Sequence, residues 1–415
     1  MTAPSIHARS IAGAPTLVEA PAGALKGRSH EGVEAFVGIP YAAPPVGSLR
    51  WREPQQAARW QGVRQAAAFG RDCPQQRLPY DATPSTHDMS EDCLTLNLWR
   101  PARAERLPVM IWIHGGGFVM GSSASPVLDG AALARRGVVL VSCNYRLGRF
   151  GFFAHPALSA GSRGPIAANF ALLDMIAVLQ WVRANIAAFG GDPGNVTLFG
   201  ESSGGAAVNF LMGAPGAHGL YHKAIVQSGA NREPYARLAT DRPGRISAER
   251  AGSAFAQHAG LASADAQQLR ALPTDVVQGG QSLMDQQADR FTGPVVDGVT
   301  VLADPIDSFT SAAVAAVPYL IGSTSAELSE ESFAPLMMNL IRSQVSADSM
   351  ADLERVYGTP PDNALIDDYF FTEAARGFAR IMSQRDAPTW RYVFDHVAES
   401  QRAARRGANH ASEIA

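Results

Sequence analysis

Apolar residues along the chain fall into short continuous runs and one long helical pattern. The runs at 107–113, 137–143 and 196–199 are almost wholly apolar, which is typical of strands buried on both faces of a parallel sheet. Residues 171–188 carry apolar side chains at three- and four-residue intervals. This spacing predicts an amphipathic helix that ends before residues 192–194, Asp-Pro-Gly. Strands that alternate with a helix in this order indicate an α/β fold.

Further strands are predicted on both sides of this central part. Residues 91–99 alternate apolar and polar side chains, and the runs at 224–227, 317–321 and 390–394 are largely apolar. Residues 15–60 are rich in proline and glycine, which predicts small antiparallel strands and an irregular covering segment. The whole pattern predicts a central, mostly parallel twisted sheet flanked by helices.

Nothing in the pattern divides the chain into domains. It has no internal repeat and no low-complexity linker, so residues 1–415 are predicted to form one domain. Residues 231–295 and 329–385 are predicted to be mostly helices and loops. Apolar residues make up 46% of the chain and charged residues 18%, a balance that supports a large core and argues against disorder.

The net charge of the chain limits the kinds of partner that are expected. A net charge of −3 gives no bulk attraction to nucleic acid or to an anionic membrane, so neither is expected as a partner. No run of about 18 apolar residues is present, so no membrane-spanning helix is expected. Residues 1–9 lack the basic and apolar regions of a secretory signal, which leaves the compartment open and favours the cytoplasm. The cysteines, Cys73, Cys93 and Cys143, lack the spacing of a zinc site, and no metal is expected.

The sequence holds a candidate nucleophile, Ser202, at the centre of a Gly-x-Ser-x-Gly pattern. A predicted strand precedes it and residues 206–212 can form a helix, which is the context of a nucleophile elbow. So sharp a turn strains the backbone at the serine and leaves no room for side chains beside it, which explains the flanking glycines. An ordinary glycine–serine turn would match the same short pattern.

A glycine-rich loop follows the predicted strand at 107–113. Residues 114–118, His-Gly-Gly-Gly-Phe, can turn backbone N–H groups into a cavity. Acyl transfer needs such donors, because negative charge develops on the carbonyl oxygen of the tetrahedral intermediate. We predict that the N–H groups of Gly116, Gly117 and Ser203 form the oxyanion hole.

A serine hydroxyl also needs a neighbouring base, and in α/β-hydrolases the chain order is serine, acid, histidine. The histidines after Ser202 are His218, His222, His258, His396 and His410. The first two are too close to Ser202 to leave room for an acid-bearing strand, and His258 falls in a predicted surface helix. His410, in a loop-like stretch, is the predicted base, and His396 remains its competitor.

A carboxylate is needed to orient the histidine. The acid should follow a strand, because ligand sites in such sheets lie at the carboxyl ends of the strands. Glu327 follows the predicted strand at 317–321 by a few residues, so it is the predicted acid. Asp297 is the rival, in a stretch that has the pattern of a turn.

Together these stretches resemble the type B carboxylesterases, a family that includes cholinesterases and bacterial para-nitrobenzyl esterases. The resemblance extends from about residue 16 to residue 414. It implies an α/β-hydrolase fold with Ser202 as nucleophile, Glu327 as acid and His410 as base. The stretches that carry it, in order, are residues 38–45, 91–97, 114–118, 144–148, 189–193, 199–205, 322–327 and 407–413.

The resemblance also implies contacts that hold the fold together. They are the ion pairs Arg50–Glu91 and Arg146–Asp174 and, in an oxidising setting, a Cys73–Cys93 disulfide.

The chain departs from the family pattern at three places. Ser203 stands where most members have alanine, although its N–H is still available to an oxyanion. The acid loop reads Ala326-Glu327-Leu328, where the family has Asp or Asn, then Glu, then Gly. Family chains also continue for several tens of residues past the histidine, whereas this sequence runs five residues past His410.

These residues predict a serine carboxylesterase that cleaves small-molecule carboxylic esters through an acyl-enzyme on Ser202, without a cofactor. Activity should rise with pH as the histidine loses its proton, near its ordinary pKa of about 6.5. Glu201, beside the nucleophile, would stabilise the imidazolium by its charge. Residues 231–295 and 329–385 are expected to form the pocket wall. Its candidate apolar lining residues are Met284, Phe291, Met337 and Met338.

Alternative functions remain open at this point. The same apparatus could cleave carbamates or amides, or transfer acyl groups to another alcohol. Outside enzymes, the family's fold is also used by adhesion and binding proteins that have lost the serine. The presence of Ser202, the glycine loop and His410 argues against a purely binding role. The oligomeric state cannot be predicted from the sequence.

Overall fold

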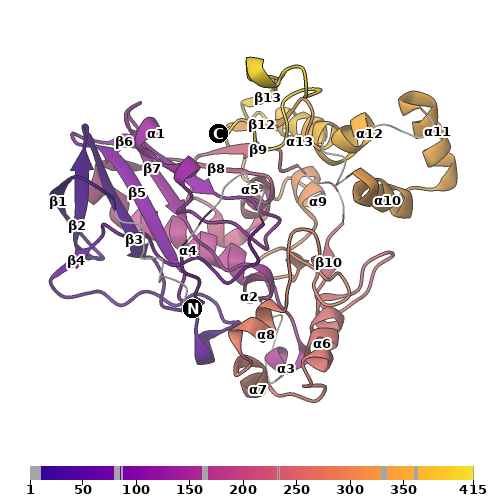
Figure 1. The fold of residues 1–415 in the computed structure, drawn as a ribbon, viewed down its shortest axis with the longest axis horizontal. Coiled ribbons are helices and arrows are strands. Elements are labelled where there is room, and N and C mark those ends of the chain that lie inside the picture. The colour runs from indigo at the N-terminus through magenta and orange to yellow at the C-terminus, as the bar shows by residue number, and fades with distance from the viewer. Residues whose placement is uncertain are drawn as a thin grey trace.

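One long β-sheet organises the chain (Figure 1). In the residues that the computed structural model describes, the sheet has eleven strands in the order β1-β2-β3-β5-β7-β6-β8-β9-β12-β13, with β4 beside β2. The described residues are 11–78, 85, 87–160, 167–230, 232, 234–328, 334–358 and 363–414. Residues 1–9, which lack a secretory pattern, lie outside them.

The first part of the sheet is antiparallel. β1 (Ala14–Ala20), β2 (Gly23–His30) and β3 (Val33–Pro40) pair in sequence, and β3 pairs with β5 (Thr95–Pro101). The short β4 (Val63–Gln65) runs parallel to β2. The antiparallel strands predicted near the amino terminus are therefore confirmed, and they continue the main sheet.

The rest of the sheet is parallel, as predicted, from β7 to β13. Because parallel strands point the same way, their carboxyl ends meet at one edge, where ligand sites form in such sheets. The strands, in spatial order, are β7 (Val139–Cys143), β6 (Leu107–Ile113), β8 (Gly191–Glu201), β9 (Lys223–Gln227), β12 (Tyr319–Thr324) and β13 (Thr389–Phe394).

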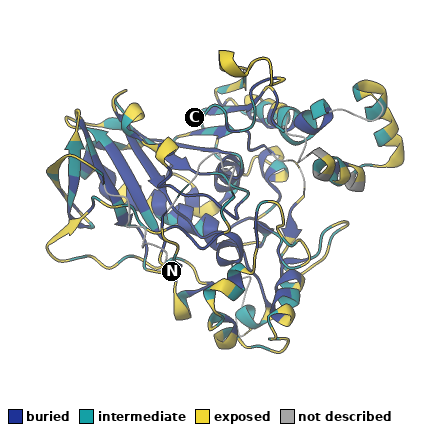
Figure 2. Cartoon of the chain, viewed as in Figure 1, coloured by how far each residue is buried: buried dark blue, intermediate teal, exposed yellow. Residues whose placement is uncertain are grey.

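Both faces of the central sheet are buried, which explains its continuous apolar strands (Figure 2). In β6, Ile111 belongs to the main core and Trp112 to a second cluster, because successive strand residues point to opposite faces. Helices α4 (Phe170–Asn185) and α5 (Ser203–Gly213) contribute to the first cluster. Helix α1 (Ala131–Ala134) contributes to the second.

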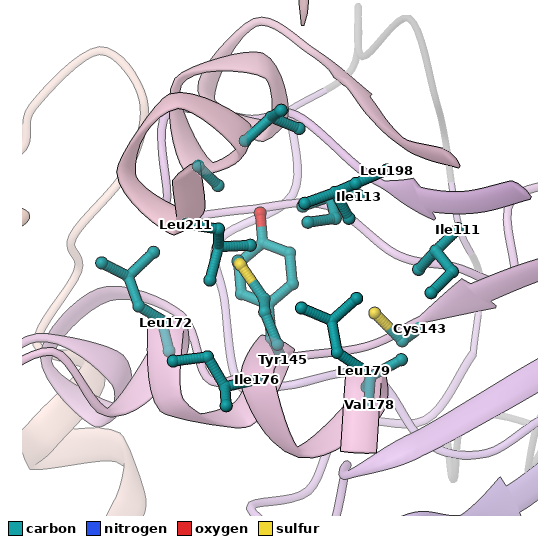
Figure 3. Close-up of a cluster of buried hydrophobic side chains, with 14 of the residues drawn as sticks. Ile111, Ile113, Cys143, Tyr145, Leu172, Ile176, Val178, Leu179, Leu198 and Leu211 are labelled. Atoms are coloured by element: carbon teal, nitrogen blue, oxygen red, sulfur yellow. The ribbon is translucent and has the colours of Figure 1, made fainter. Parts of the chain in front are cut away.

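The main core is filled by an aromatic ring between α4 and α5. Tyr145, just after β7, is fully buried. Its ring lies among Leu172 and Ile176 of α4 and Leu211 of α5 (Figure 3). The loop that follows β7 is therefore fixed by the packing of both helices.

Helix α4 confirms the predicted helix at 171–188. It ends at Asn185 and is followed by one 3-10 turn (Ile186–Phe189) that stops at Gly190, which adopts a left-handed φ of 73°. The combined segment Phe170–Phe189 is long and apolar enough to cross a membrane by composition. Within the fold, however, 67% of its most apolar window is buried, as in a core helix.

The segments predicted to be helices and loops have that structure where they are described. Figure 1 shows their helices on one side of the sheet's parallel half. Residues 231–295 also contribute β10 (Ala236–Arg237) and β11 (Val295–Val296), which pair with each other. The remaining helices of the chain are α2 (Gly148–Gly151), α3 (Pro156–Ser159), α6 (Ala248–His258), α7 (Ala266–Arg270), α8 (Thr274–Gln278), α9 (Pro305–Thr310), α10 (Ala334–Gln344), α11 (Ala347–Tyr357), α12 (Asn363–Asp367) and α13 (Glu373–Ser383).

The strand predicted at 91–99 begins only at Thr95, so the prediction was wrong for its first four residues. The Cys93 N–H donates to the Glu91 carbonyl and the Thr95 N–H to the Cys93 carbonyl, which bends the backbone away from the sheet. The Glu91 carboxylate is bound by the Arg50 guanidinium at 2.7 Å and by the Thr274 hydroxyl at 2.6 Å. The Arg50–Glu91 pair is thus confirmed.

The Arg146–Asp174 pair is also confirmed, and it ties the loop after β7 to α4. The guanidinium donates to both carboxylate oxygens, at 2.8 and 2.7 Å, and the Arg146 N–H adds a third bond. Both side chains are at most 3% exposed. Two buried charges of opposite sign in this geometry satisfy each other.

The three cysteines are buried and unbonded thiols in this structure. Cys93 hydrogen-bonds with Cys73, and this bond together with burial raises the pKa of the Cys93 thiol well above its ordinary value. The pair expected to form a disulfide in an oxidising setting is therefore adjacent here in its reduced form. Cys143 lies within β7 as a small, buried core residue.

Replacing Asp174 with Asn should lower the free energy of unfolding by about 3–5 kcal/mol, because Arg146 would keep a buried charge without a counter-charge. Urea denaturation measures the loss. As a control, Asp352→Asn breaks the exposed Asp352–Arg355 pair, in which both side chains are more than half exposed, and should leave stability nearly unchanged. Equal effects of the two substitutions would contradict a structural role for the buried pair.

Candidate active site

The carboxyl ends of four neighbouring strands bring the predicted site residues together. In the sheet register, Ile113 of β6 lies opposite Gly200 of β8. Gln227 of β9 lies opposite both Glu201 of β8 and Gly322 of β12. The loops that follow these strands therefore leave the sheet side by side.

The turn at Ser202 has the geometry of a nucleophile elbow. Its backbone adopts φ 55° and ψ −126°, a strained conformation for a residue with a side chain. Its N–H donates to the Gln227 carbonyl at 2.9 Å, which fixes the turn to β9. A Cβ on Gly204 would lie 2.1 Å from the Ile113 carbonyl oxygen, and one on Gly200 would lie 2.7 Å from the same atom. Close approach explains why both flanking residues are glycines.

The glycine-rich loop lies directly against this turn. A Cβ on Gly115 would meet the Glu201 carboxylate at 2.8 Å and the Ser202 Cβ at 3.0 Å. Gly116 and Gly117 adopt φ values of 105° and 61°, which favour glycine. The loop can therefore take this path only because its central residues lack side chains.

Three backbone N–H groups of the glycine-rich loop and of the turn at Ser202 are available as donors. Within the described part of the chain, the N–H groups of Gly116, Gly117 and Ser203 donate no hydrogen bond to the protein. Ser203 is also the first residue of α5, so its N–H lies at the positive end of the helix dipole. The geometry suits an oxyanion, which such preorganised donors stabilise.

Glu327 is buried and held by two donors. Its Oε1 accepts from the Ser228 hydroxyl at 2.6 Å and from the Thr324 N–H at 2.8 Å. Its Oε2 lies 2.5 Å from the Nδ1 of His410. Ser228 was missed in the sequence, where only its position just after the strand at 224–227 could have indicated it.

The loop that carries His410 is anchored to the loop that carries Glu327. The His410 N–H donates to the Glu327 carbonyl at 3.0 Å. The Ala326 N–H donates to the Ala408 carbonyl at 3.0 Å, and the Ala408 N–H to the Ser325 hydroxyl at 2.9 Å. Although His410 lies near the end of the sequence, its backbone is therefore fixed relative to the acid.

The other ring nitrogen of His410 faces Glu201. Its Nε2 lies 3.1 Å from the Glu201 Oε1, and the imidazole is 25% exposed. In the part of the chain that the structure describes, the Ser202 hydroxyl has no hydrogen-bond partner. The structure thus brings the His410 imidazole against Glu327 through Nδ1 and against Glu201, the residue before Ser202, through Nε2.

The surrounding carboxylates change the protonation of His410. Burial disfavours the imidazolium, but the charge of Glu201, the hydrogen bond to Glu327 and the charge of Glu413 outweigh it and raise the pKa of His410 to about 9. Burial raises the pKa of Glu201 to about 7, against the opposing effect of the His410 charge. The imidazolium is therefore the stable form at neutral pH.

The two rivals predicted from sequence lie elsewhere. Asp297 is buried, and its carboxylate accepts from Asn169 and from the N–H groups of residues 299–301, so it organises a turn. His396 is exposed, and its ring contacts Phe394. Neither residue contacts Ser202 or Glu327 among the interactions of the described residues.

Two segments contribute side chains near the site. Leu283 Cδ1 and Gln286 Nε2 would lie 2.5 and 3.2 Å from a Cβ on Gly117. The ring of Phe371 lies 5.3 Å from that of His410, in a π-helical turn (Asp368–Thr372) between α12 and α13. Such turns are frequent at functional sites.

The candidate lining residues from the sequence occupy other positions. Phe291 is buried in the main core, and Met284 is 37% exposed. Met337 and Met338 pack against a separate cluster around Ile341. Among the described residues, no group of three or more His, Cys, Asp or Glu side chains could hold a metal ion.

The comparison with known proteins identifies the family of the chain. The sequence profile of the carboxylesterase family matches residues 14–357. The fumonisin B1 esterase of Sphingopyxis macrogoltabida is 36% identical over 410 residues, which cover 94% of this chain and 73% of the relative. The para-nitrobenzyl esterase of Bacillus subtilis (strain 168) is 35% identical over 401 residues, which cover 90% of this chain and 77% of the relative.

Solved structures confirm the α/β-hydrolase fold. A carboxylesterase of Geobacillus stearothermophilus superposes with a TM-score of 0.81 at 34% identity, covering 96% of this chain and 82% of that one. A PNB esterase superposes with a TM-score of 0.78 at 33% identity and the same coverage. None of these findings favours the alternative functions. The chain belongs to the carboxylesterase family, and it is a serine esterase that hydrolyses carboxylic esters.

Proposed function

We propose that Ser202 is the nucleophile, that His410 is its general base and that Glu327 orients the imidazole. The observation that carries this proposal is the 2.5 Å hydrogen bond between Glu327 and His410, beside a serine on a strained elbow. An acid, a histidine and a half-buried serine hydroxyl at one edge of the sheet are the parts that serine hydrolases require.

In the acylation step, His410 takes the proton of the Ser202 hydroxyl as its oxygen attacks the ester carbonyl. The imidazole must first turn its Nε2 from Glu201 to Ser202, while Nδ1 stays bonded to Glu327. The N–H groups of Gly116, Gly117 and Ser203 hold the oxyanion. Collapse of the intermediate expels the alcohol, which receives the proton from His410, and leaves the acyl group on Ser202.

Deacylation reverses these roles. Water loses a proton to His410 as it attacks the acyl carbonyl, and the same donors stabilise the second oxyanion. Ser202 leaves with the proton from His410, and the carboxylic acid is released. This cycle needs no metal or organic cofactor.

The substrates we propose are small-molecule esters, enclosed by the segments at 231–295 and 329–385 of a single domain. Support for the wall comes from Leu283 and Gln286 beside the oxyanion loop and from Phe371 beside His410. The named relatives act on fumonisin B1 and on para-nitrobenzyl esters, which are both small molecules. The pocket lining predicted from the sequence is apolar, and Gln286 adds a polar amide to it. Esters of moderate polarity therefore fit the proposed pocket as well as alkyl esters do.

A fluorophosphonate should label the purified protein with one adduct per chain, and the modified peptide should contain Ser202. Ser202→Ala should abolish both the label and the hydrolysis of p-nitrophenyl esters, because the elbow presents no other hydroxyl in the same position. Intact-mass and peptide mass spectrometry measure the adduct. Labelling of the Ala variant at an unchanged rate would refute the assignment.

The value of kcat/KM should rise with pH and reach its midpoint well above 6.5, toward 9. Only the neutral imidazole accepts the proton of Ser202, and the carboxylates raise the pKa of His410 to about 9. The structure thus corrects the lower midpoint expected from an ordinary histidine. A stopped-flow or steady-state pH profile with a p-nitrophenyl ester measures the midpoint.

The matched control for this profile is a pair of charge-removing variants. Glu201→Gln should move the midpoint to lower pH, because it removes the charge nearest to the Nε2 of His410. Asp352→Asn removes an exposed carboxylate on α11 and should leave the midpoint unchanged. A wild-type midpoint near 6.5 that Glu201→Gln does not shift would contradict the electrostatic account.

A further inference from the structure

We propose that the Ser203 side chain is a positioning residue, which holds the oxyanion loop through a chain of hydrogen bonds. This inference rests on the proposed function and concerns the hydroxyl of Ser203, not its N–H. The Phe118 N–H donates to the Ser203 Oγ at 3.2 Å. Phe118 ends the loop that carries Gly116 and Gly117, and both Phe118 and Ser203 are buried.

The same hydroxyl continues to the other end of the loop. The Ser203 hydroxyl lowers the pKa of the Tyr145 phenol, which burial raises overall. The Tyr145 hydroxyl donates to the His114 carbonyl at 2.8 Å. Each hydroxyl can accept one bond and donate another, so the proposed series runs from Phe118 through Ser203 and Tyr145 to His114, with its first and last bonds at 3.2 and 2.8 Å. The series joins both ends of the loop to Tyr145, which the core fixes between α4 and α5 (Figure 3).

The loop needs such support because its backbone is strained. Phe118 has a φ of 62°, and it follows Gly116 and Gly117, which also have positive φ. A residue with a side chain stays in this region only where its surroundings fix it. The Phe118 carbonyl is fixed by the Gly148 N–H at 2.7 Å, and its N–H is fixed by Ser203.

Removal of the Ser203 hydroxyl would leave a buried N–H without a partner beside the oxyanion hole. The peptide planes that orient the Gly116 and Gly117 donors lie within the same short turn. Loss of the bond therefore affects transition-state stabilisation more than substrate binding. The N–H that the hydroxyl accepts belongs to Phe118, in another element, and not to α5.

The bond of the Ser203 hydroxyl comes from the loop and not from α5. Ser203→Ala removes one oxygen atom and leaves the backbone of the elbow unchanged, so the variant is expected to fold.

The test compares Ser203→Ala with Ser203→Thr, which keeps the hydroxyl. For a p-nitrophenyl ester, Ser203→Ala should lower kcat about fivefold to tenfold and change KM by less than about twofold. Its affinity for a trifluoromethyl ketone, whose adduct with serine carries an oxyanion, should fall by a similar factor. Ser203→Thr should retain most of the lost activity and affinity.

Tyrosine variants supply a second readout. Tyr145→Phe should lower kcat in the same way as Ser203→Ala. The double variant should lose less kcat than the product of the two single losses, because both substitutions act on the same series of bonds. Tyr319→Phe is the matched control. Tyr319 begins β12, and its buried hydroxyl donates to the Asn209 Oδ1 of α5 at 2.7 Å, so this variant should lose stability but keep kcat.

The inference is overturned if Ser203→Ala equals the wild type in kcat and in ketone affinity, or if only its KM changes. It is equally overturned if Ser203→Ala and Tyr145→Phe have independent, multiplicative effects. Fluorophosphonate labelling of the wild type separates this result from failure of the proposed function. A wild type that takes no label refutes the roles given to Ser202 and His410, whereas a labelled wild type with an unaltered Ala variant refutes only the role of the Ser203 hydroxyl.

Discussion

The close contact between the end of β6 and the turn at Ser202 is the constraint on which the rest of the site depends. The Ile113 carbonyl approaches Gly200 and Gly204 so closely that neither position has room for a Cβ. This contact maintains a serine backbone that would otherwise be strained. The oxyanion loop starts at His114, one residue later, so the same contact places the loop against the nucleophile. The packing of the sheet and the proposed oxyanion hole thus depend on the same contact.

The carboxylates around His410 form a second constraint on the site. They fix the direction of the imidazole ring, and they also favour its protonated form. Glu327 fixes the ring through Nδ1, while Glu201 holds Nε2, the nitrogen that Ser202 needs. In the proposed mechanism both carboxylates stabilise the imidazolium that forms during each proton transfer, and they also favour it in the resting protein. Loss of the proton weakens the attraction to Glu201 and leaves Nε2 able to accept a hydrogen bond. Protonation and the direction of the ring are therefore coupled.

Much of this arrangement could be predicted from the sequence, because its parts are local patterns. The residues at 114–118 and 199–205 have spacings that the loop and elbow require, and the apolar runs predicted the parallel strands. Contacts between distant segments could not be predicted in this way. Ser228 meets Glu327 only through the register of β9 and β12, and the backbone at 91–94 leaves the sheet where Glu91 binds Arg50.

The central claim is that the acyl group is carried by Ser202. A slowly hydrolysed p-nitrophenyl carbamate tests it most directly, because a carbamoyl adduct persists long enough for peptide mapping. The account predicts release of one p-nitrophenol per chain, with the added mass on the peptide at Ser202 and none after Ser202→Ala. Carbamoylation at another residue, or full activity toward p-nitrophenyl esters in the Ser202→Ala variant, would contradict it.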